Sequence, residues 1–164
     1  MPLLVRGIPD NRGSYLGDAA VKSVYLIGSL RNPQVVEIAN YLETLGFDVF
    51  SDWHAASPIA DDSWQEYEKK RGRTYDEALR GYAATHIFEF DHYHLNRCHI
   101  GVLLMPAGKS GHIELGYLMG QGKPGFVLFD KEPDRWDVMY RFCEGVFFEI
   151  EALGQALCKY GNTV

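Results

Sequence analysis

A short glycine-rich segment, MPAGKSGHIELGY at residues 105–117, carries the residue types best suited to chemistry. It contains Gly-Lys-Ser, the last three letters of the P-loop that cradles nucleotide phosphates. A P-loop also needs a glycine five residues before Gly108, and that position is Leu103. The P-loop interpretation therefore fails. What remains is a turn that leads into a predicted helix, with Glu114 expected in its first turn whether Ser110 or Gly111 is the cap.

Glu114 is the candidate catalytic group of this segment. The positive end of a helix dipole keeps a nearby carboxylate ionised. An ionised carboxylate is what a nucleophile, or a stabiliser of an oxocarbenium ion at a sugar carbon, must be. The flanking glycines would leave room for a ligand. Position alone has a simpler explanation, because acidic residues in first turns also stabilise helices without any catalytic role.

The elements that must position Glu114 follow from hydrophobic periodicity. Apolar runs predict strands at residues 23–28, 47–51, 99–105, 125–129 and 145–149. Helical spacing occupies 35–45, 63–96 (two helices broken near Gly72 or Gly81), 113–119, 136–142 and 150–159. This alternation predicts an α/β fold: a five-stranded parallel sheet with helices on both faces, a Rossmann-like or flavodoxin-like three-layer sandwich.

Ligands of such a sheet bind beyond the carboxyl ends of the strands, so the residues after each strand are candidates. They are Gly28, Ser29 and Arg31, then Asp52 and Trp53, then Gly108, Lys109, Ser110 and Gly111, and finally Asp130. We expect Gly28 and Ser29 to offer N–H groups at a helix N-terminus, with Arg31 adding a fork of donors for a phosphate or carboxylate. Lys109 and Ser110 could add to that set, and Trp53 and Tyr25 could stack on a heterocycle.

Length and composition restrict the class of protein. The chain has 164 residues, 46% of them hydrophobic, which predicts one domain at residues 22–164 after an N-terminal extension at 1–21. A formal net charge of −6 argues against a nucleic-acid polymer as partner. The three cysteines lack metal-type spacing, and no apolar run is long enough for a membrane span. We expect a cytoplasmic protein without a metal or another cofactor.

Three segments together resemble the nucleoside 2-deoxyribosyltransferase family, including its deoxynucleoside 5'-monophosphate N-glycosidase branch. They are YLIGSLR at residues 25–31, Asp91, and GHIELGY at residues 111–117. The likeness covers about residues 23 to 130. It implies that Glu114 attacks the anomeric carbon, that Asp91 assists the leaving base, and that Tyr25 orients the nucleophile or the sugar. It also implies that Arg31 and Ser29 hold a 5'-phosphate.

The resemblance has one departure and several further implications. The transferases carry an aspartate, and the monophosphate hydrolases a serine, where this chain has Gly108, six residues before Glu114. Arg31 favours the monophosphate. The family implies a small nucleoside or nucleoside monophosphate as substrate, and a homodimer or higher homo-oligomer. The insert at residues 54–81 is poorly matched and is expected to shape the base pocket.

Other interpretations stay open at this level. A non-catalytic nucleotide-binding or sensing module would not need Glu114, and a related glycosidase could act on a ribonucleotide or a dinucleotide cofactor. His92 and His94 would point to different helix faces, which argues against a shared metal. Asp61 and Asp62 are most simply a helix cap. Packing in the core or a dimer is expected for the aromatic residues Tyr82, Phe88, Phe90, Tyr93, Trp136 and Tyr140.

Overall fold

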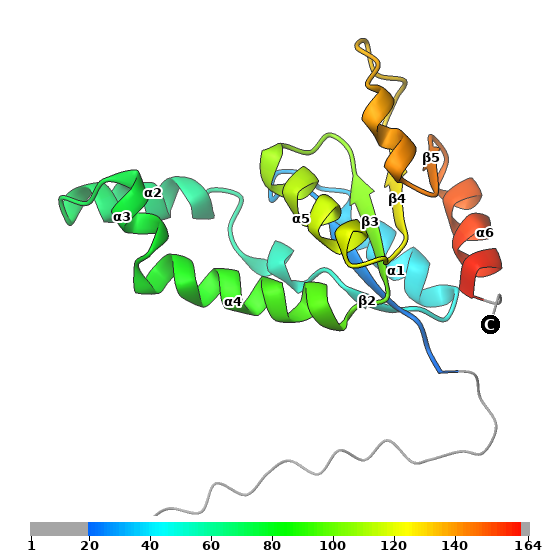
Figure 1. Ribbon diagram of the computed structural model, residues 1–164, viewed down its shortest axis with the longest axis horizontal. Coiled ribbons are helices and arrows are strands. Elements are labelled where there is room, and N and C mark those ends of the chain that lie inside the picture. Colours follow the sequence, from blue (N-terminus) through cyan, green and yellow to red (C-terminus); the bar gives the residue numbers. More distant parts are fainter. Residues whose placement is uncertain (1–19, 162–164) are drawn as a thin grey trace, which may run out of the picture.

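The most apolar segments of the chain lie side by side as strands of one sheet in the computed structural model, which describes residues 20–161 (Figure 1). The strands are β1 (Ser23–Ile27), β2 (Asp48–Phe50), β3 (Ile100–Leu104), β4 (Gly125–Leu128) and β5 (Gly145–Phe147). All pairs are parallel, in the order β2-β1-β3-β4-β5. The expected fold class is confirmed. Residues 1–19 of the expected extension lie outside the described part of the chain.

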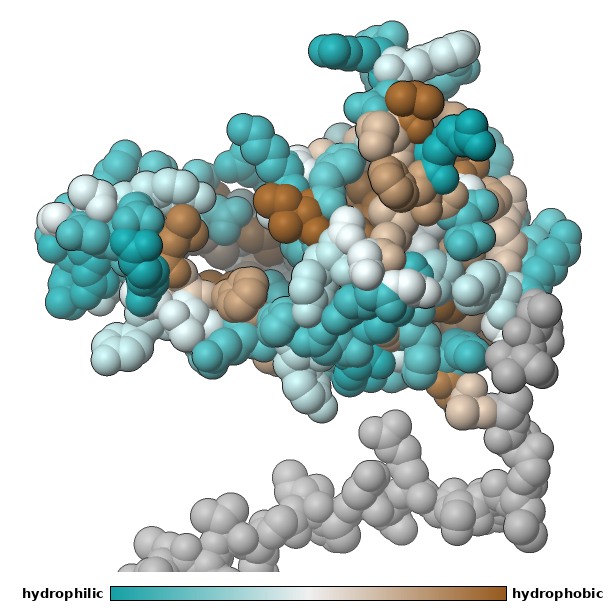
Figure 2. Space-filling model, viewed as in Figure 1, coloured by the Kyte–Doolittle hydropathy of each residue, from teal (hydrophilic) through white to brown (hydrophobic). Residues whose placement is uncertain are grey.

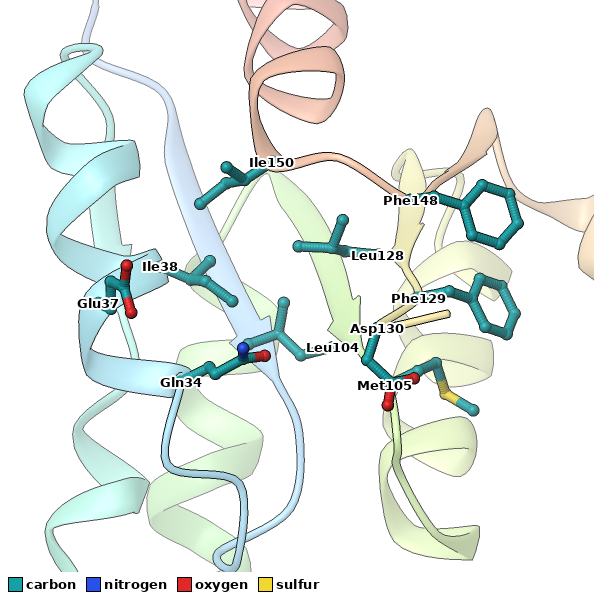
Figure 3. A pocket seen from close by; sticks show the side chains of 10 residues that line it. All are labelled: Gln34, Glu37, Ile38, Leu104, Met105, Leu128, Phe129, Asp130, Phe148 and Ile150. Atoms are coloured by element: carbon teal, nitrogen blue, oxygen red, sulfur yellow. The ribbon is translucent and has the colours of Figure 1, made fainter. Parts of the chain in front are cut away.

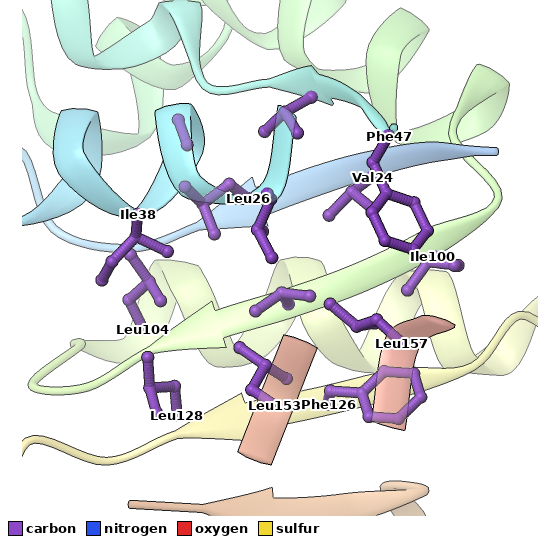
Figure 4. Packing of buried hydrophobic residues seen from close by; sticks show 14 of the residues in the cluster. Val24, Leu26, Ile38, Phe47, Ile100, Leu104, Phe126, Leu128, Leu153 and Leu157 are labelled. Carbon is purple, nitrogen blue, oxygen red and sulfur yellow. The ribbon is translucent and has the colours of Figure 1, made fainter. Parts of the chain in front are cut away.

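The helices α1 (Val35–Thr44) and α6 (Ile150–Gly161) cover one face of the sheet. Figure 4 shows the core on this face, where Val24 and Leu26 of β1 meet Ile38, Leu153 and Leu157 from the two helices. Leu153 and Leu157 are completely buried. Burying such a side chain stabilises a fold by about 1.5–3 kcal/mol, so this face anchors the sheet.

The opposite face of the sheet is covered by α5 (Lys109–Gly120) and by the C-terminal part of α4 (Tyr82–Arg97). Successive side chains of a strand point to opposite faces, so Tyr25 and Ile27 lie here while Val24 and Leu26 lie on the other side. They pack with Leu95 of α4 and Leu115 of α5. This alternation brings Tyr25 to the same side of the sheet as the helix that carries Glu114.

An arm formed by α2 (Ala60–Lys70), α3 (Tyr75–Leu79) and the start of α4 extends away from the sheet (Figure 1). It corresponds to the poorly matched insert. The sequence predicted a break near Gly72 or Gly81, and both occur: Gly72 takes a positive φ of 72°, and Gly81 precedes α4. Three helices therefore replace the expected two. Figure 2 shows the molecular surface hollowed between this arm and the body that contains the sheet.

The aromatic residues of α4 contradict part of the sequence analysis. Core packing was one expectation, but Tyr82 is 94% exposed, and Phe88, Phe90 and Tyr93 are also exposed. Packing within a dimer stays a prediction for these side chains. Trp136 is likewise exposed, so it does not pack in the core, and it precedes the short 3-10 helix η2 (Val138–Phe142). Tyr140 does pack, edge-on against Phe129.

Two smaller features complete the description of the fold. The first strand ends one residue earlier than expected, at Ile27, and the fifth is shorter, ending at Phe147. Within residues 20–161, no helix is long and apolar enough to cross a lipid bilayer.

Candidate functional site

Three elements bring the predicted catalytic residues Tyr25, Asp91 and Glu114 together. Tyr25 lies in β1 and is completely buried. Asp91 precedes the buried Leu95 by four positions on α4, so both face the sheet. Glu114 follows Gly111 by three positions and precedes Leu118 by four, and both of these are buried against the sheet. The two carboxyl groups and the phenol influence one another electrostatically.

Both carboxyl groups hold protons more tightly than exposed ones. Burial, and secondarily the negative charge of Asp91, raise the pKa of Glu114 to about 7, while the Tyr25 hydroxyl opposes that rise. Burial raises the pKa of Asp91 to about 6. The pKa of Tyr25 is raised by burial and then by the charges of Glu114 and Asp91, so the phenol stays neutral. Between about pH 6 and 7 the two carboxyl groups therefore share about one proton, which Glu114 holds more of the time because its pKa is the higher.

The helix dipole does not explain the state of Glu114, which corrects the sequence analysis. Helix α5 begins at Lys109 with Gly108 as its N-cap, so neither Ser110 nor Gly111 is the cap. Glu114 consequently lies in the second turn, and the first turn contains no acidic residue. The charge on Glu114 is disfavoured by burial instead of being held by the helix terminus.

Two buried polar atoms at this cluster, the hydroxyl oxygen of Tyr25 and Oδ1 of Asp91, make no hydrogen bond of ordinary geometry, although the Tyr25 hydroxyl lies close enough to Glu114 to lower the pKa of that carboxyl group. A buried polar atom that leaves its hydrogen bond unmade costs about 1–3 kcal/mol, and folded proteins contain few of them. The cluster therefore offers an acceptor and a donor to a ligand, next to Glu114.

The loop after β1 differs from the expected phosphate cradle. Helix α1 begins only at Val35, after the turn that contains Pro33, so Gly28 and Ser29 do not lie at its N-terminus. Ser29 Oγ instead accepts the backbone N–H of Arg31 at 3.1 Å. The guanidinium of Arg31 is exposed and donates to Asp62 of α2, with Nη2 and Oδ2 3.0 Å apart. Asp62 and Asp61 lie inside the first turn of α2, whose N-cap is Ile59, so they are not the cap itself.

The turn before α5 divides into exposed and packed residues. Gly108, Lys109 and Ser110 are exposed, directly after the cis peptide bond between Met105 and Pro106. Gly111 is buried: a Cβ there would lie 3.1 Å from Leu103 Cδ1 and 3.3 Å from Ile27 Cγ2. Gly111 thus lets α5 approach the sheet, while its three neighbours remain accessible to a ligand.

Trp53 is held in place by the body of the protein. Its indole Nε1 donates to the backbone oxygen of Leu26 at 2.7 Å, and its ring packs against both hydrophobic cores. It lies in the 3-10 helix η1 (Asp52–Ala55), after β2 as expected. The role of Trp53 in stacking on a heterocycle stays a prediction.

A cavity of about 200 Å³ lies at the carboxyl edge of β3 and β4, on the face covered by α1 and α6 (Figure 3). Apolar side chains form its floor, while Gln34, Glu37 and Asp130 lie around it. Asp130 is the only residue of the sequence-predicted strand-end set that lines it. The cavity is therefore separate from the Tyr25, Asp91 and Glu114 cluster on the other face.

His112 is a residue of the site region that sequence reasoning missed. Its Nδ1 donates to the carbonyl of Gly108 at 2.7 Å, and its Nε2 accepts from the hydroxyl of Tyr140 at 2.9 Å. It thereby links the turn before α5 to η2. The only signal in the sequence was its place two residues before Glu114.

Two histidines of α4, His92 and His94, make different contacts. His92 hydrogen-bonds to Tyr117 of α5 at 2.8 Å, whereas His94 stacks on Phe50 at a ring separation of 3.7 Å. They point to different sides, as the helical spacing predicted. In the described residues 20–161, no group of three acidic, histidine or cysteine side chains is arranged to hold a metal ion.

Comparison with known proteins identifies the architecture. No family model matches the chain, and no curated protein matches it in sequence. Among solved structures, it is similar to a 2-deoxyribosyltransferase from the psychrotolerant bacterium Bacillus psychrosaccharolyticus, with a TM-score of 0.58. The chain has the 2-deoxyribosyltransferase fold. The match covers 83% of this chain and 95% of the other, at 18% sequence identity.

Because the match covers 95% of the bacterial chain, almost all of that enzyme's fold has a counterpart in this chain. The bacterial enzyme is described as a suitable biocatalyst for the synthesis of antiviral and antitumoral nucleosides.

Proposed function

We propose that this chain belongs to the nucleoside 2-deoxyribosyltransferase family and cleaves the N-glycosidic bond of a 2'-deoxynucleoside or its 5'-monophosphate. Glu114 is the nucleophile, Asp91 the proton donor to the leaving base, and Tyr25 the group that orients Glu114. Hydrolysis and base transfer differ only in whether water or a second base receives the sugar.

The observation that carries this proposal is the buried cluster of two carboxyl groups and one phenol. A glycosidic bond is cleaved by a pair of carboxyl groups, one ionised and one protonated. Between about pH 6 and 7 the pair holds about one proton, since the pKa of Glu114 is raised to about 7 and that of Asp91 to about 6. The higher pKa places that proton mainly on Glu114, so the proposed roles use the less populated arrangement, in which Asp91 is protonated and Glu114 is ionised. The nearby Tyr25 hydroxyl lowers the pKa of Glu114, which favours its ionised form as nucleophile.

The reaction follows from these roles. The Glu114 carboxylate forms a bond to C1' of the deoxyribose while the bond from C1' to the base nitrogen breaks, and the base leaves with the proton of Asp91. Asp91, now ionised, then takes a proton from the attacking water or acceptor base. A bond forms from C1' to the oxygen of that water or the nitrogen of that base while the bond from C1' to Glu114 breaks, and the Glu114 carboxylate is restored.

The test is a panel of deoxynucleosides, ribonucleosides and their 5'-monophosphates, with release of free base followed by chromatography. Deoxy substrates should react, and Glu114→Ala and Glu114→Gln should each lower the rate at least about a thousandfold. Glu43→Gln, which alters an exposed glutamate of α1, is the matched control. An added acceptor base separates transfer from hydrolysis.

Three outcomes contradict the proposal or change it. Binding without base release identifies a non-catalytic nucleotide-binding module. Release that survives in Glu114→Ala refutes the nucleophile, and release only from ribose substrates assigns a different glycosidase.

A further inference from the structure

Asp62 of the arm contacts the residue predicted to bind a substrate phosphate. Arg31 Nη2 and Asp62 Oδ2 are 3.0 Å apart, which is an ion pair between the loop after β1 and the first turn of α2. The arm and the body meet across this pair. The guanidinium that could recognise a phosphate is therefore already engaged by a carboxylate of the same chain.

The geometry makes this pairing open to competition. The side chains of Arg31 and Asp62 are 70% and 63% exposed, so a ligand reaches both without unfolding the arm. The contact recorded is through one guanidinium nitrogen, which leaves the other donors for a second anion. An anion bound to them would lie within a few ångströms of the Asp62 carboxylate, where like charges repel each other.

The neighbouring carboxylates also repel a phosphate that approaches Arg31. Asp61 lies beside Asp62 in the first turn of α2, and Asp52 is exposed after β2. The whole chain is acidic, with a formal net charge of −6. A phosphate dianion meets this potential, whereas the 5'-hydroxyl of a nucleoside does not.

We propose that Asp62 is a specificity-determining residue: by pairing with Arg31, it favours a deoxynucleoside with a free 5'-hydroxyl over the corresponding 5'-monophosphate. This inference rests on the proposed function. It reverses the expectation that Arg31 alone selects the monophosphate. It also gives the insert at residues 54–81 a role in substrate choice.

The test compares kcat/KM for a deoxynucleoside and its 5'-monophosphate in the wild type, Asp62→Asn and Asp61→Asn. Asp62→Asn should raise kcat/KM for the monophosphate about five- to tenfold and leave that for the nucleoside within about twofold. Asp61→Asn removes the same charge from the same helical turn but breaks no ion pair with Arg31, so it should change the ratio far less. Thermal unfolding verifies that both variants fold.

Two further variants test the mechanism behind the effect. The gain from Asp62→Asn should disappear in Arg31→Ala, because the carboxylate then has no guanidinium to compete for. In a Glu114→Ala background, which binds without turnover, calorimetric affinity for the monophosphate should rise with Asp62→Asn.

The outcomes separate this inference from the proposed function. An unchanged substrate ratio in Asp62→Asn, an equal effect from Asp61→Asn, or a gain that persists in Arg31→Ala each overturns the inference while base release stands. If the wild type releases no base from any substrate, the proposed function fails and the inference falls with it.

Discussion

The shared proton of Glu114 and Asp91 makes a prediction about catalysis against pH. The proposed reaction needs one carboxylate and one carboxylic acid, so kcat/KM should follow a bell with its maximum between about pH 6 and 7. Below that range both groups are protonated and no nucleophile exists. Above it both are ionised and the base leaves unassisted. Initial rates over pH 4.5 to about 9 measure the profile, and a flat profile would show that this pair does not limit the reaction.

The raised pKa of Glu114 also makes a prediction about stability. Its ordinary value of 4.5 applies to the unfolded chain, and its value of about 7 applies to the folded one. Between these values the folded state binds more protons, so the free energy of unfolding falls as pH rises through this window. Glu114→Gln removes that loss, and it should stabilise the protein at pH 8 by roughly 1–3 kcal/mol while changing little at pH 4.

Urea unfolding of wild type and Glu114→Gln at both pH values measures this difference. Glu43→Gln, on the exposed surface of α1, should show no comparable dependence on pH. A loss of stability in Glu114→Gln at pH 8 would mean that the carboxylate is structurally paired, which would also remove the basis for its role as nucleophile.

At the scale of elements, the approach of α5 to the sheet depends on Gly111. An added Cβ would lie 3.1 Å from Leu103 Cδ1 and 3.3 Å from Ile27 Cγ2, so Gly111→Ala should displace the start of α5 and Glu114 with it. We expect a loss of activity of about tenfold or more, because small misplacements of a catalytic group cost that much. Steady-state kinetics measure it, with circular dichroism to confirm folding.

Gly116 provides the control in the same helix. A Cβ there meets nothing within 4 Å, so Gly116→Ala should stabilise α5 by about 0.5–1 kcal/mol without a comparable loss of activity. Equal losses of activity in both variants would show that the spacing between helix and sheet is not what positions Glu114.

The hydrophobic pattern predicted the strands well, and it predicted the start of α5 poorly. β1, β3 and β4 are continuous buried runs, which a parallel sheet requires and which few other structures produce. Helix α1 begins at Val35, as expected, but the start of α5 was misplaced because Gly108 caps it without a side-chain hydrogen bond, so the usual capping residues gave no signal.

The proximity of the three candidate catalytic residues was predictable from the sequence, but their charge was not. The resemblance selected Tyr25, Asp91 and Glu114, and the structure brings them together. Their raised pKa values come from burial between α4, α5 and the sheet, which requires knowledge of packing that the sequence does not contain. The pairing of Arg31 with Asp62 was missed for the same reason, since nothing in the loop after β1 indicates where α2 lies.

At the scale of the whole molecule, the arm contains a buried carboxylate of its own. Glu68 of α2 is only 2% exposed, its Oε2 pairs with Arg73 at 2.7 Å, and its Oε1 has no partner. Arg73→Ala would leave a buried carboxylate without its counter-charge, so we expect the arm to open locally. Hydrogen exchange should then quicken across residues 60–81 and remain slow in β1 and β3.

Lys70→Ala is the matched control for this prediction. It breaks the ion pair of Lys70 with Glu66, but both side chains are about 70% exposed and such pairs contribute little. Faster exchange in the sheet of Arg73→Ala would mean instead that arm and body unfold as one unit.

The three groups of the candidate site come from β1, α4 and α5, which are far apart along the chain. No fragment or partly folded intermediate can hold them in one place, because each is supplied by a different piece of the tertiary structure. Regain of turnover after dilution from denaturant should therefore trail the return of helical signal. Recovered turnover is therefore a stricter test of complete folding than recovered helical signal.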